Sequence, residues 1–204
     1  MTALDACDAV LADIRACTLC ADALPRAPRP ILQAGATARI GIFGQAPGNL
    51  AHERGRPFAD PSGVRLRAWL GVDEAVFYNR TRIAVAPMGF CFPGTAERGG
   101  DLPPRPECAP AWRDRLLATM PNLRLEILVG SYAVKWRLGV RARRTLTETV
   151  AHWRDYGGRV FPLPHPSWRN NAWLARNPWF EATCLPALRA AVAAALSDSP
   201  SSDG

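Results

Sequence analysis

Lysine is almost absent from this chain: of 25 basic residues 24 are arginine, and Lys135 is the only lysine. The guanidinium of arginine binds phosphate through a planar fork and stacks on nucleic-acid bases. With a formal net charge of +7 and a pI of about 9.6, the composition favours an acidic partner such as a nucleic acid. A surface of scattered charges, or a GC-rich genome, is the alternative explanation of the same bias.

The chain also lacks any run of about 18 uninterrupted apolar residues, the length that a membrane-spanning helix requires. Residues 1–5 have neither the basic nor the apolar region of a signal peptide. We therefore expect a cytoplasmic protein that does not enter a membrane. We also expect it to be a monomer. Its length predicts a single domain over residues 1–196. Residues 197–204, rich in Ser, Asp and Pro, predict a flexible tail.

What the sequence does contain is an alternation of short apolar strands and amphipathic helices. Strands are predicted over residues 39–43, 83–86, 125–129 and 160–163. Helices are predicted over residues 5–16, 62–70, 110–120, 131–138 and 180–196, the last interrupted near Pro186. This order implies helices on both faces of a parallel sheet. The predicted fold class is a three-layer α/β/α domain with a central, mainly parallel four-stranded sheet.

Three loops rich in glycine or proline follow predicted strands, over residues 44–58, 87–93 and 164–171. The carboxyl ends of parallel strands are where open α/β sheets bind ligands. The first loop begins with GQAPG (residues 44–48, the glycine loop), a rigid turn whose backbone can approach a flat ligand closely. The third loop contains His165 between two prolines, a position that favours a functional role over a packing one.

The ordered set of motifs resembles the uracil-DNA glycosylase superfamily, and most closely its iron–sulfur-containing family 4 branch. Residues 40–63 resemble the first motif, with Gly-x-Ala-Pro-Gly and a downstream Gly-x-Pro-Phe. Residues 127–133 (ILVGSYA) resemble the strand and glycine turn before a helix, and residues 160–167 (VFPLPHPS) resemble the second motif. The resemblance implies an enzyme of base excision repair that hydrolyses the N-glycosidic bond of uracil flipped out of single- or double-stranded DNA.

The resemblance also implies roles for individual residues in a base pocket. Phe58 matches the aromatic residue that stacks on the flipped base, and His165 matches the donor that stabilises negative charge on the departing base. Backbone amides around Gln45, in the loop that also holds Ala46 and Gly48, are implied to bind the base edge. A core role under the loop is the alternative for Phe58.

Three residues that follow His165 are implied to bind DNA. Ser167 matches a residue that positions a phosphate or orients the loop. Trp168 or Arg169 stands where the family inserts a wedge into the vacated base stack. A packing role is the alternative for Trp168.

The group that activates water departs from the family pattern. Ala46 stands where the best-known family has an aspartate, and Gln45 stands where family 4 has a glutamate. The acidic or basic groups available nearby are His52 and Glu53, either of which could hold a water. The alternative is that these two side chains lie in a solvent-exposed loop and have no catalytic role.

Base selection departs from the family as well. Relatives carry an asparagine at the end of the strand before the third cysteine, and no asparagine stands there in this chain. Uracil is then expected to be read by backbone groups of Met88, Gly89 and Phe90. Gly48 replaces the bulky tyrosine that excludes the thymine methyl group in the best-known family.

Four of the six cysteines match the family 4 cluster ligands in order and approximate spacing: Cys17, Cys20, Cys91 and Cys108. The resemblance therefore implies a [4Fe-4S] cluster, with zinc as the second choice for four thiolates. Cys7 and Cys184 have no matching partner and are expected to be buried apolar residues.

The position of the single lysine bears on the reaction type. Bifunctional glycosylases form a Schiff base through an amine, but Lys135 lies in the helix predicted over residues 131–138, away from the three loops. A monofunctional hydrolase is therefore expected. Two alternatives stay open: a non-catalytic binder of uracil-containing or abasic DNA, and a glycosylase that becomes covalently attached to the sugar through a histidine such as His52.

Overall fold

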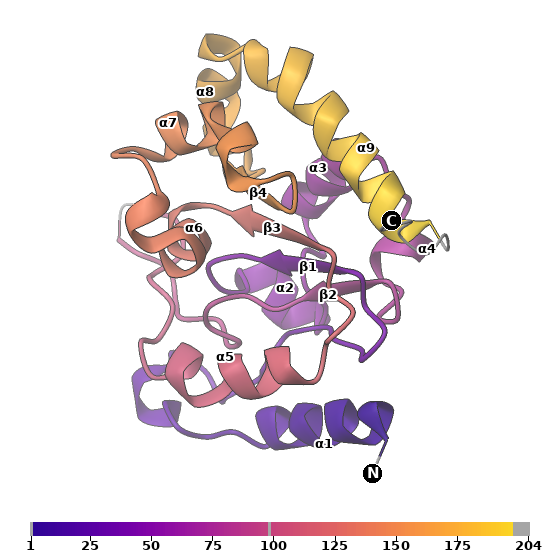
Figure 1. Ribbon diagram of the computed structural model, residues 1–204. Helices are drawn as coiled ribbons and strands as arrows, with labels where there is room; N and C mark the ends of the chain where they lie inside the picture. The colour runs from indigo at the N-terminus through magenta and orange to yellow at the C-terminus, as the bar shows by residue number, and fades with distance from the viewer. Residues whose placement is uncertain (1, 98, 198–204) are drawn as a thin grey trace.

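The computed structural model describes residues 2–97 and 99–197, and its centre is a four-stranded sheet in the order β2-β1-β3-β4 (Figure 1). The strands are β1 (Ile40–Phe43), β2 (Ile83–Val85), β3 (Leu125–Val129) and β4 (Val160–Leu163). All three pairings are parallel, and Ile40 on β1 lies between Ile83 and Leu125 of the neighbouring strands. The predicted parallel sheet is therefore confirmed. Of the tail predicted over residues 197–204, all but Ser197 lies outside the described residues.

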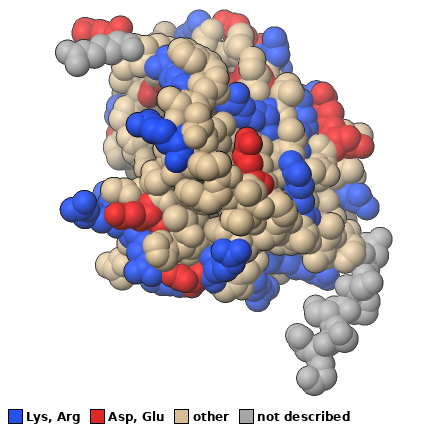
Figure 2. Space-filling view, turned by 90° about the horizontal axis from the view of Figure 1, so that it is seen from above, with Lys and Arg blue, Asp and Glu red and all other residues tan. Residues whose placement is uncertain are grey.

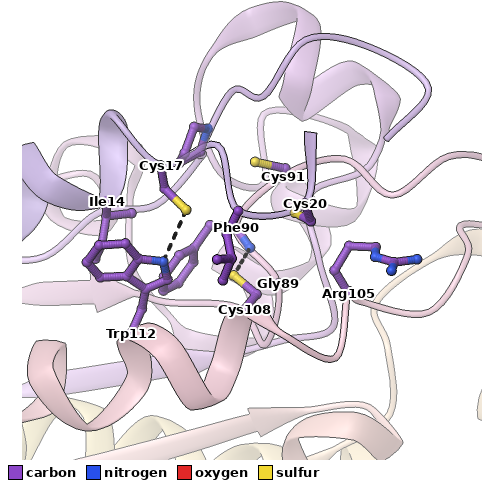
Figure 3. Close-up of a pocket in the computed structure, with 11 residues that line it drawn as sticks. Ile14, Cys17, Cys20, Gly89, Phe90, Cys91, Arg105, Cys108 and Trp112 are labelled. Atoms are coloured by element: carbon purple, nitrogen blue, oxygen red, sulfur yellow. Dashed lines mark hydrogen bonds between the residues drawn. The ribbon is translucent and has the colours of Figure 1, made fainter. Parts of the chain in front are cut away.

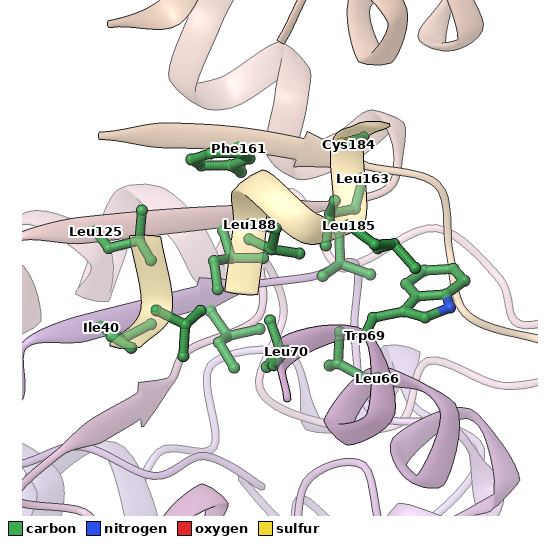
Figure 4. Packing of buried hydrophobic residues seen from close by; sticks show 14 of the residues in the cluster. Ile40, Leu66, Trp69, Leu70, Leu125, Phe161, Leu163, Cys184, Leu185 and Leu188 are labelled. Carbon is green, nitrogen blue, oxygen red and sulfur yellow. The ribbon is translucent and has the colours of Figure 1, made fainter. Parts of the chain in front are cut away.

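Apart from Glu126 on β3, the strand residues are apolar, because helices cover both faces of the sheet. Ile40 and Ile42 point to one face, where they pack against α3 (Pro61–Leu70) and α9 (Leu185–Leu196) (Figure 4). Phe43 points to the other face, which is covered by α1 (Ala3–Arg15), α5 (Cys108–Ala118) and α6 (Ser131–Leu138). Figure 1 shows α3 and α9 above the sheet and α1 and α5 below it, so the predicted three layers are confirmed.

Side-chain caps set where several helices begin. Thr2 and Asp5 form a capping box at the start of α1, with Thr2 as the N-cap residue. Asp60 caps α3 by accepting a hydrogen bond from the Gly63 N–H. The N-cap residue of α6 is Gly130, with φ of 84°, and this helix has no side-chain cap.

Several short elements complete the chain and were not predicted from the sequence. They are α2 (Asn49–Arg54), α4 (Glu74–Phe77), α7 (Leu146–Ala151) and α8 (Asn171–Arg176), with 3₁₀ turns over Ala21–Ala23, Gly139–Arg141, Trp153–Tyr156 and Trp168–Asn170. A π-helical turn, Phe180–Cys184, precedes α9 at the interruption predicted near Pro186.

No single helix among the described residues is long and apolar enough to cross a membrane. One pair, Trp168–Arg176 with Phe180–Leu196, meets the length and composition criteria together but is bent by 90°.

Candidate functional site

A pocket opens where β1, β2 and β4 end. The glycine loop follows β1, Pro87 follows β2 and His165 follows β4. Residues from all three strand ends line this pocket together with Phe58, Asp60 and Asp101. Because the strands are parallel, residues far apart in the sequence meet at one edge of the sheet. The structure therefore brings the glycine loop, Phe58 and His165 together, as the sequence predicted.

Phe58 is held in a backbone conformation that side chains rarely adopt. Its φ of 52° is the only positive value for a non-glycine residue in the described part of the chain. The Tyr78 hydroxyl can donate to the carbonyl oxygens of Pro57 (3.0 Å) and Phe58 (3.2 Å). Gly63 lies so close that a Cβ built there would be 1.7 Å from the Phe58 carbonyl oxygen. Strain of this kind persists where surrounding contacts fix it, and it clusters at functional sites.

The His165 ring faces the Phe58 ring across the pocket, with centroids 6.4 Å apart and planes 30° from parallel. The Asn170 side chain donates to the His165 carbonyl oxygen (2.7 Å) and holds this loop in place. Burial lowers the pKa of His165, while the Asp60 carboxylate opposes this effect. The imidazole is therefore neutral at pH 7 and has one ring N–H to donate.

The glycine loop is tied to a second segment by the side chain of Gln45. Its Nε2 atom donates to the carbonyl oxygen of Leu102 (2.8 Å) and lies 3.3 Å from that of Asp101. The backbone N–H groups of Gln45 and Ala46 have no acceptor among the described residues. These two amides are therefore free to bind a ligand in the pocket.

Asp101 is a pocket residue that sequence reasoning missed. It ends a small turn in which the Leu102 N–H donates to the Gly94 carbonyl oxygen (2.8 Å) and Thr95 pairs with Asp101 in an antiparallel bridge. A Cβ built at Gly48 would lie 3.1 Å from Asp101 Oδ2, so this carboxylate lies against the glycine loop. No motif marks Asp101, and only the folded chain brings it to the pocket.

The structure does not bring His52 and Glu53 to the pocket. His52 packs near Phe92, with ring centroids 6.0 Å apart, and its pKa is lowered by burial and by nearby arginines. Glu53 lies at the surface, where it accepts a hydrogen bond from Asn49 (2.8 Å) and lies 3.7 Å from Arg26. Only Ala51 of helix α2 lines the pocket.

Met88, Gly89 and Phe90 also lie outside the lining of this pocket. The N–H groups of Met88 and Gly89 donate to carbonyl oxygens of the glycine loop (2.8 and 3.0 Å). The Phe90 N–H donates to Cys108 Sγ (3.4 Å). Since these donors are engaged in the fold, they do not face a base in the way the sequence predicted.

The residues expected to contact DNA follow His165 in the chain and do not line the pocket. Trp168 is 71% exposed, which leaves its indole without the burial of a packing residue. The Arg169 guanidinium lies 5.4 Å from the centre of the Trp168 ring, and Arg65 donates to the Ser167 carbonyl oxygen (3.0 Å). Figure 2 shows basic side chains spread over one face of the molecule with acidic ones between them, rather than gathered in one stripe.

A second pocket is lined by all four cysteines expected to act as ligands: Cys17, Cys20, Cys91 and Cys108 (Figure 3). Trp112 Nε1 donates to Cys17 Sγ (3.3 Å). Burial raises the pKa of Cys91 and of Cys108 to about 11, so both thiols are protonated without a bound cation. Within residues 2–97 and 99–197, no three Cys, His, Asp or Glu side chains form a group that could hold a metal ion.

The remaining cysteines and the lysine lie away from both pockets. Cys7 and Cys184 are fully buried in the two halves of the core, as predicted. Lys135 is an exposed residue of α6 and lines neither the base pocket nor the cysteine pocket.

Two comparisons relate the chain to known proteins. A family model described as "Uracil DNA glycosylase superfamily" matches residues 33–189, which is more than half of the chain. A solution NMR structure described as "a putative Uracil DNA glycosylase from Methanosarcina acetivorans" is similar at 17% sequence identity and a TM-score of 0.43. That similarity covers 78% of this chain and 93% of the other. The range matched by the family model includes the glycine loop, Phe58 and His165.

Proposed function

Because the chain belongs to the uracil DNA glycosylase superfamily, we propose that it hydrolyses the N-glycosidic bond of uracil in DNA. The observation that carries the proposal is the shared pocket of the glycine loop, Phe58 and His165. An aromatic ring, an imidazole donor and free backbone amides around one cavity are what a flipped pyrimidine requires.

In this proposal the flipped base stacks on Phe58, whose ring is held in place by the fixed backbone around it. As the bond to the sugar breaks, negative charge builds on the base carbonyl oxygen. The neutral His165 ring donates a hydrogen bond to that oxygen and stabilises the charge. The oxygen of a water molecule then forms the new bond to the C1′ atom of the sugar. The exposed Trp168, or Arg169 beside it, would fill the space that the base leaves in the duplex.

A gel assay on uracil-containing single- and double-stranded oligonucleotides tests the proposal. Abasic product formed over several turnovers supports it. Binding without product would instead make the protein a non-catalytic binder of such DNA. An adduct that survives SDS would make it a covalently self-trapping protein. That third outcome is not favoured, since His52 does not line the pocket.

We expect borohydride to trap no covalent complex with uracil-containing DNA. Trapping requires a Schiff base, and Lys135 lies on α6, outside the pocket. The measurement is a denaturing gel after incubation with the reductant, with a bifunctional glycosylase as the positive control. A trapped band that disappears in a Lys135→Ala variant would contradict the monofunctional assignment.

We further propose that the four cysteines of the second pocket hold a [4Fe-4S] cluster, with zinc as the second choice. Their side chains line one pocket, and the Cys17 and Cys108 sulfurs accept N–H hydrogen bonds. No three of the described side chains are gathered into a ligand group, so binding a cluster requires these thiols to turn toward one another. Such bonds are typical of thiolates around iron–sulfur clusters. A cluster there would tie the segment after α1, the loop after β2 and the start of α5 together.

Protein purified without oxygen is expected to be brown and to contain about four iron atoms per chain. A Cys91→Ser, Cys108→Ser variant is expected to lose the iron, whereas the control Cys7→Ala, which changes a buried core cysteine, retains it. The measurements are elemental analysis and the visible absorbance spectrum. Native protein that contains zinc and no iron would select the second choice, and protein with neither metal would overturn the proposed centre.

A further inference from the structure

The glycine loop contains no carboxylate, so the group that activates water must come from elsewhere in the pocket. Two acidic residues line it among the described residues, Asp60 and Asp101. Asp60 is already engaged, because its Oδ1 atom accepts the Gly63 N–H (2.9 Å) and caps α3. No described residue makes a hydrogen bond or ion pair with the Asp101 carboxylate, so neither of its oxygens is engaged by the described part of the chain.

Two features of the glycine loop allow the Asp101 carboxylate to lie beside it. The Gln45 side chain binds the backbone of the Asp101–Leu102 segment, so the segment is anchored to the loop it faces. Gly48 has no side chain to fill the space beside the carboxylate, and even a Cβ there would crowd Oδ2 at 3.1 Å. Glycine at position 48 therefore lets the carboxylate lie close to the loop without a tight contact.

The charges around Asp101 suit a proton acceptor. Burial and the neighbouring Asp60 carboxylate raise the pKa of Asp101, while the Arg169 guanidinium opposes that rise. The residue is exposed on its outer side, so solvent water can reach it. A carboxylate made more basic by its surroundings accepts a proton from water more readily than an unperturbed one.

We propose that Asp101 is the catalytic base of the hydrolysis, a role that rests on the proposed function. A water molecule hydrogen-bonded to Asp101 attacks the sugar C1′ atom, and its oxygen forms the new C–O bond. The bond from C1′ to the base nitrogen breaks, and its electron pair leaves with the base, where His165 stabilises the charge. The proton released by the water passes to the Asp101 carboxylate and then to solvent. The products are the free base and an abasic sugar.

The test compares the full-length wild-type protein with Asp101→Asn, which keeps the shape of the side chain and removes its basicity. Single-turnover excision from a uracil-containing single-stranded oligonucleotide is expected to slow about 100-fold in the variant. Affinity for an oligonucleotide with a non-hydrolysable 2′-fluoro-deoxyuridine, measured by fluorescence anisotropy, is expected to stay unchanged. Asp114→Asn, an exposed carboxylate on α5 with no hydrogen bond or ion pair to the described residues, is the matched control.

If the wild-type protein is active, three results would overturn the role of Asp101. Excision by Asp101→Asn at the wild-type rate would show that the carboxylate is not needed. Loss of affinity equal to the loss of rate would make Asp101 a binding residue instead. A larger loss of excision rate in Glu53→Gln than in Asp101→Asn would indicate that Glu53 on α2 is the catalytic base instead. Wild-type protein that binds this DNA but releases no base would overturn the proposed function itself, and the role of Asp101 with it.

Discussion

Replacing His165 with alanine is expected to slow single-turnover uracil excision by about 10²–10³-fold, the cost of removing one donor aimed at developing negative charge. The structure places the ring opposite Phe58, and the Asn170 side chain fixes the backbone of the loop that carries it. Burial keeps the ring neutral, so its N–H is available as a donor at pH 7 without a change of protonation.

The measurement is the rate of abasic-site formation with enzyme in excess over DNA, so that binding does not limit the result. His152→Ala is the matched control, because His152 is exposed at the end of α7 and lines neither pocket. The control is expected to act at the wild-type rate. An unchanged rate in His165→Ala would rule out the donor role and leave the backbone amides of the glycine loop as the only donors proposed for the base.

Replacing Gly63 with alanine is expected to destabilise the protein by about 1–3 kcal/mol, the usual cost of forcing extra atoms into a packed site. The added Cβ would lie 1.7 Å from the Phe58 carbonyl oxygen, so the strained backbone of Phe58 must move. Gly63 lies inside α3, where exchange of glycine for alanine ordinarily stabilises a helix by about 0.5–1 kcal/mol. The clash with Phe58 lowers stability, whereas the higher helix propensity of alanine raises it. The sign of the measured change therefore shows whether the close approach to Phe58 dominates.

Urea denaturation followed by circular dichroism measures this change, with Ser62→Ala in the same turn of α3 as the control. Excision by folded Gly63→Ala is expected to fall as well, because the Phe58 ring shifts with its backbone. A Gly63→Ala protein as stable as the wild type would show that Phe58 does not depend on this close approach.

The sheet could be predicted from sequence because its strands are short apolar runs bounded by glycine and proline. The ranges predicted for β3 and β4 match the structure, and α3 presents Leu66, Trp69 and Leu70 to the core at helical spacing, all of them buried. Parallel topology then places every loop after a strand at one edge, which is why His165 and the glycine loop could be assigned to one site.

The short helices could not be predicted for a physical reason. An isolated helix of four to six residues is unstable by itself, and its sequence shows less than two turns of periodicity. Helix α2 is such a segment, and its presence decides where His52 and Glu53 lie. A reading of that segment as an open loop put both side chains beside the water, whereas the helix leaves them outside the pocket lining.

Asp101 and Asn170 were missed because their roles depend on tertiary contacts. Asp101 reaches the pocket through a turn closed by the Leu102–Gly94 hydrogen bond and through the side chain of Gln45. Asn170 acts through a hydrogen bond to the His165 backbone, and the residue type alone does not predict this contact. The glycine loop could be predicted from its local sequence, whereas contacts between residues far apart in the chain could not.

The central claim is that the pocket between the glycine loop, Phe58 and His165 releases uracil from DNA. The most direct measurement is the amount of free uracil released per enzyme molecule from a uracil-containing single-stranded oligonucleotide, quantified by mass spectrometry. We expect more than one uracil per wild-type molecule, and far less from His165→Ala in the same time. Release of no uracil by wild-type protein that binds this DNA would contradict it.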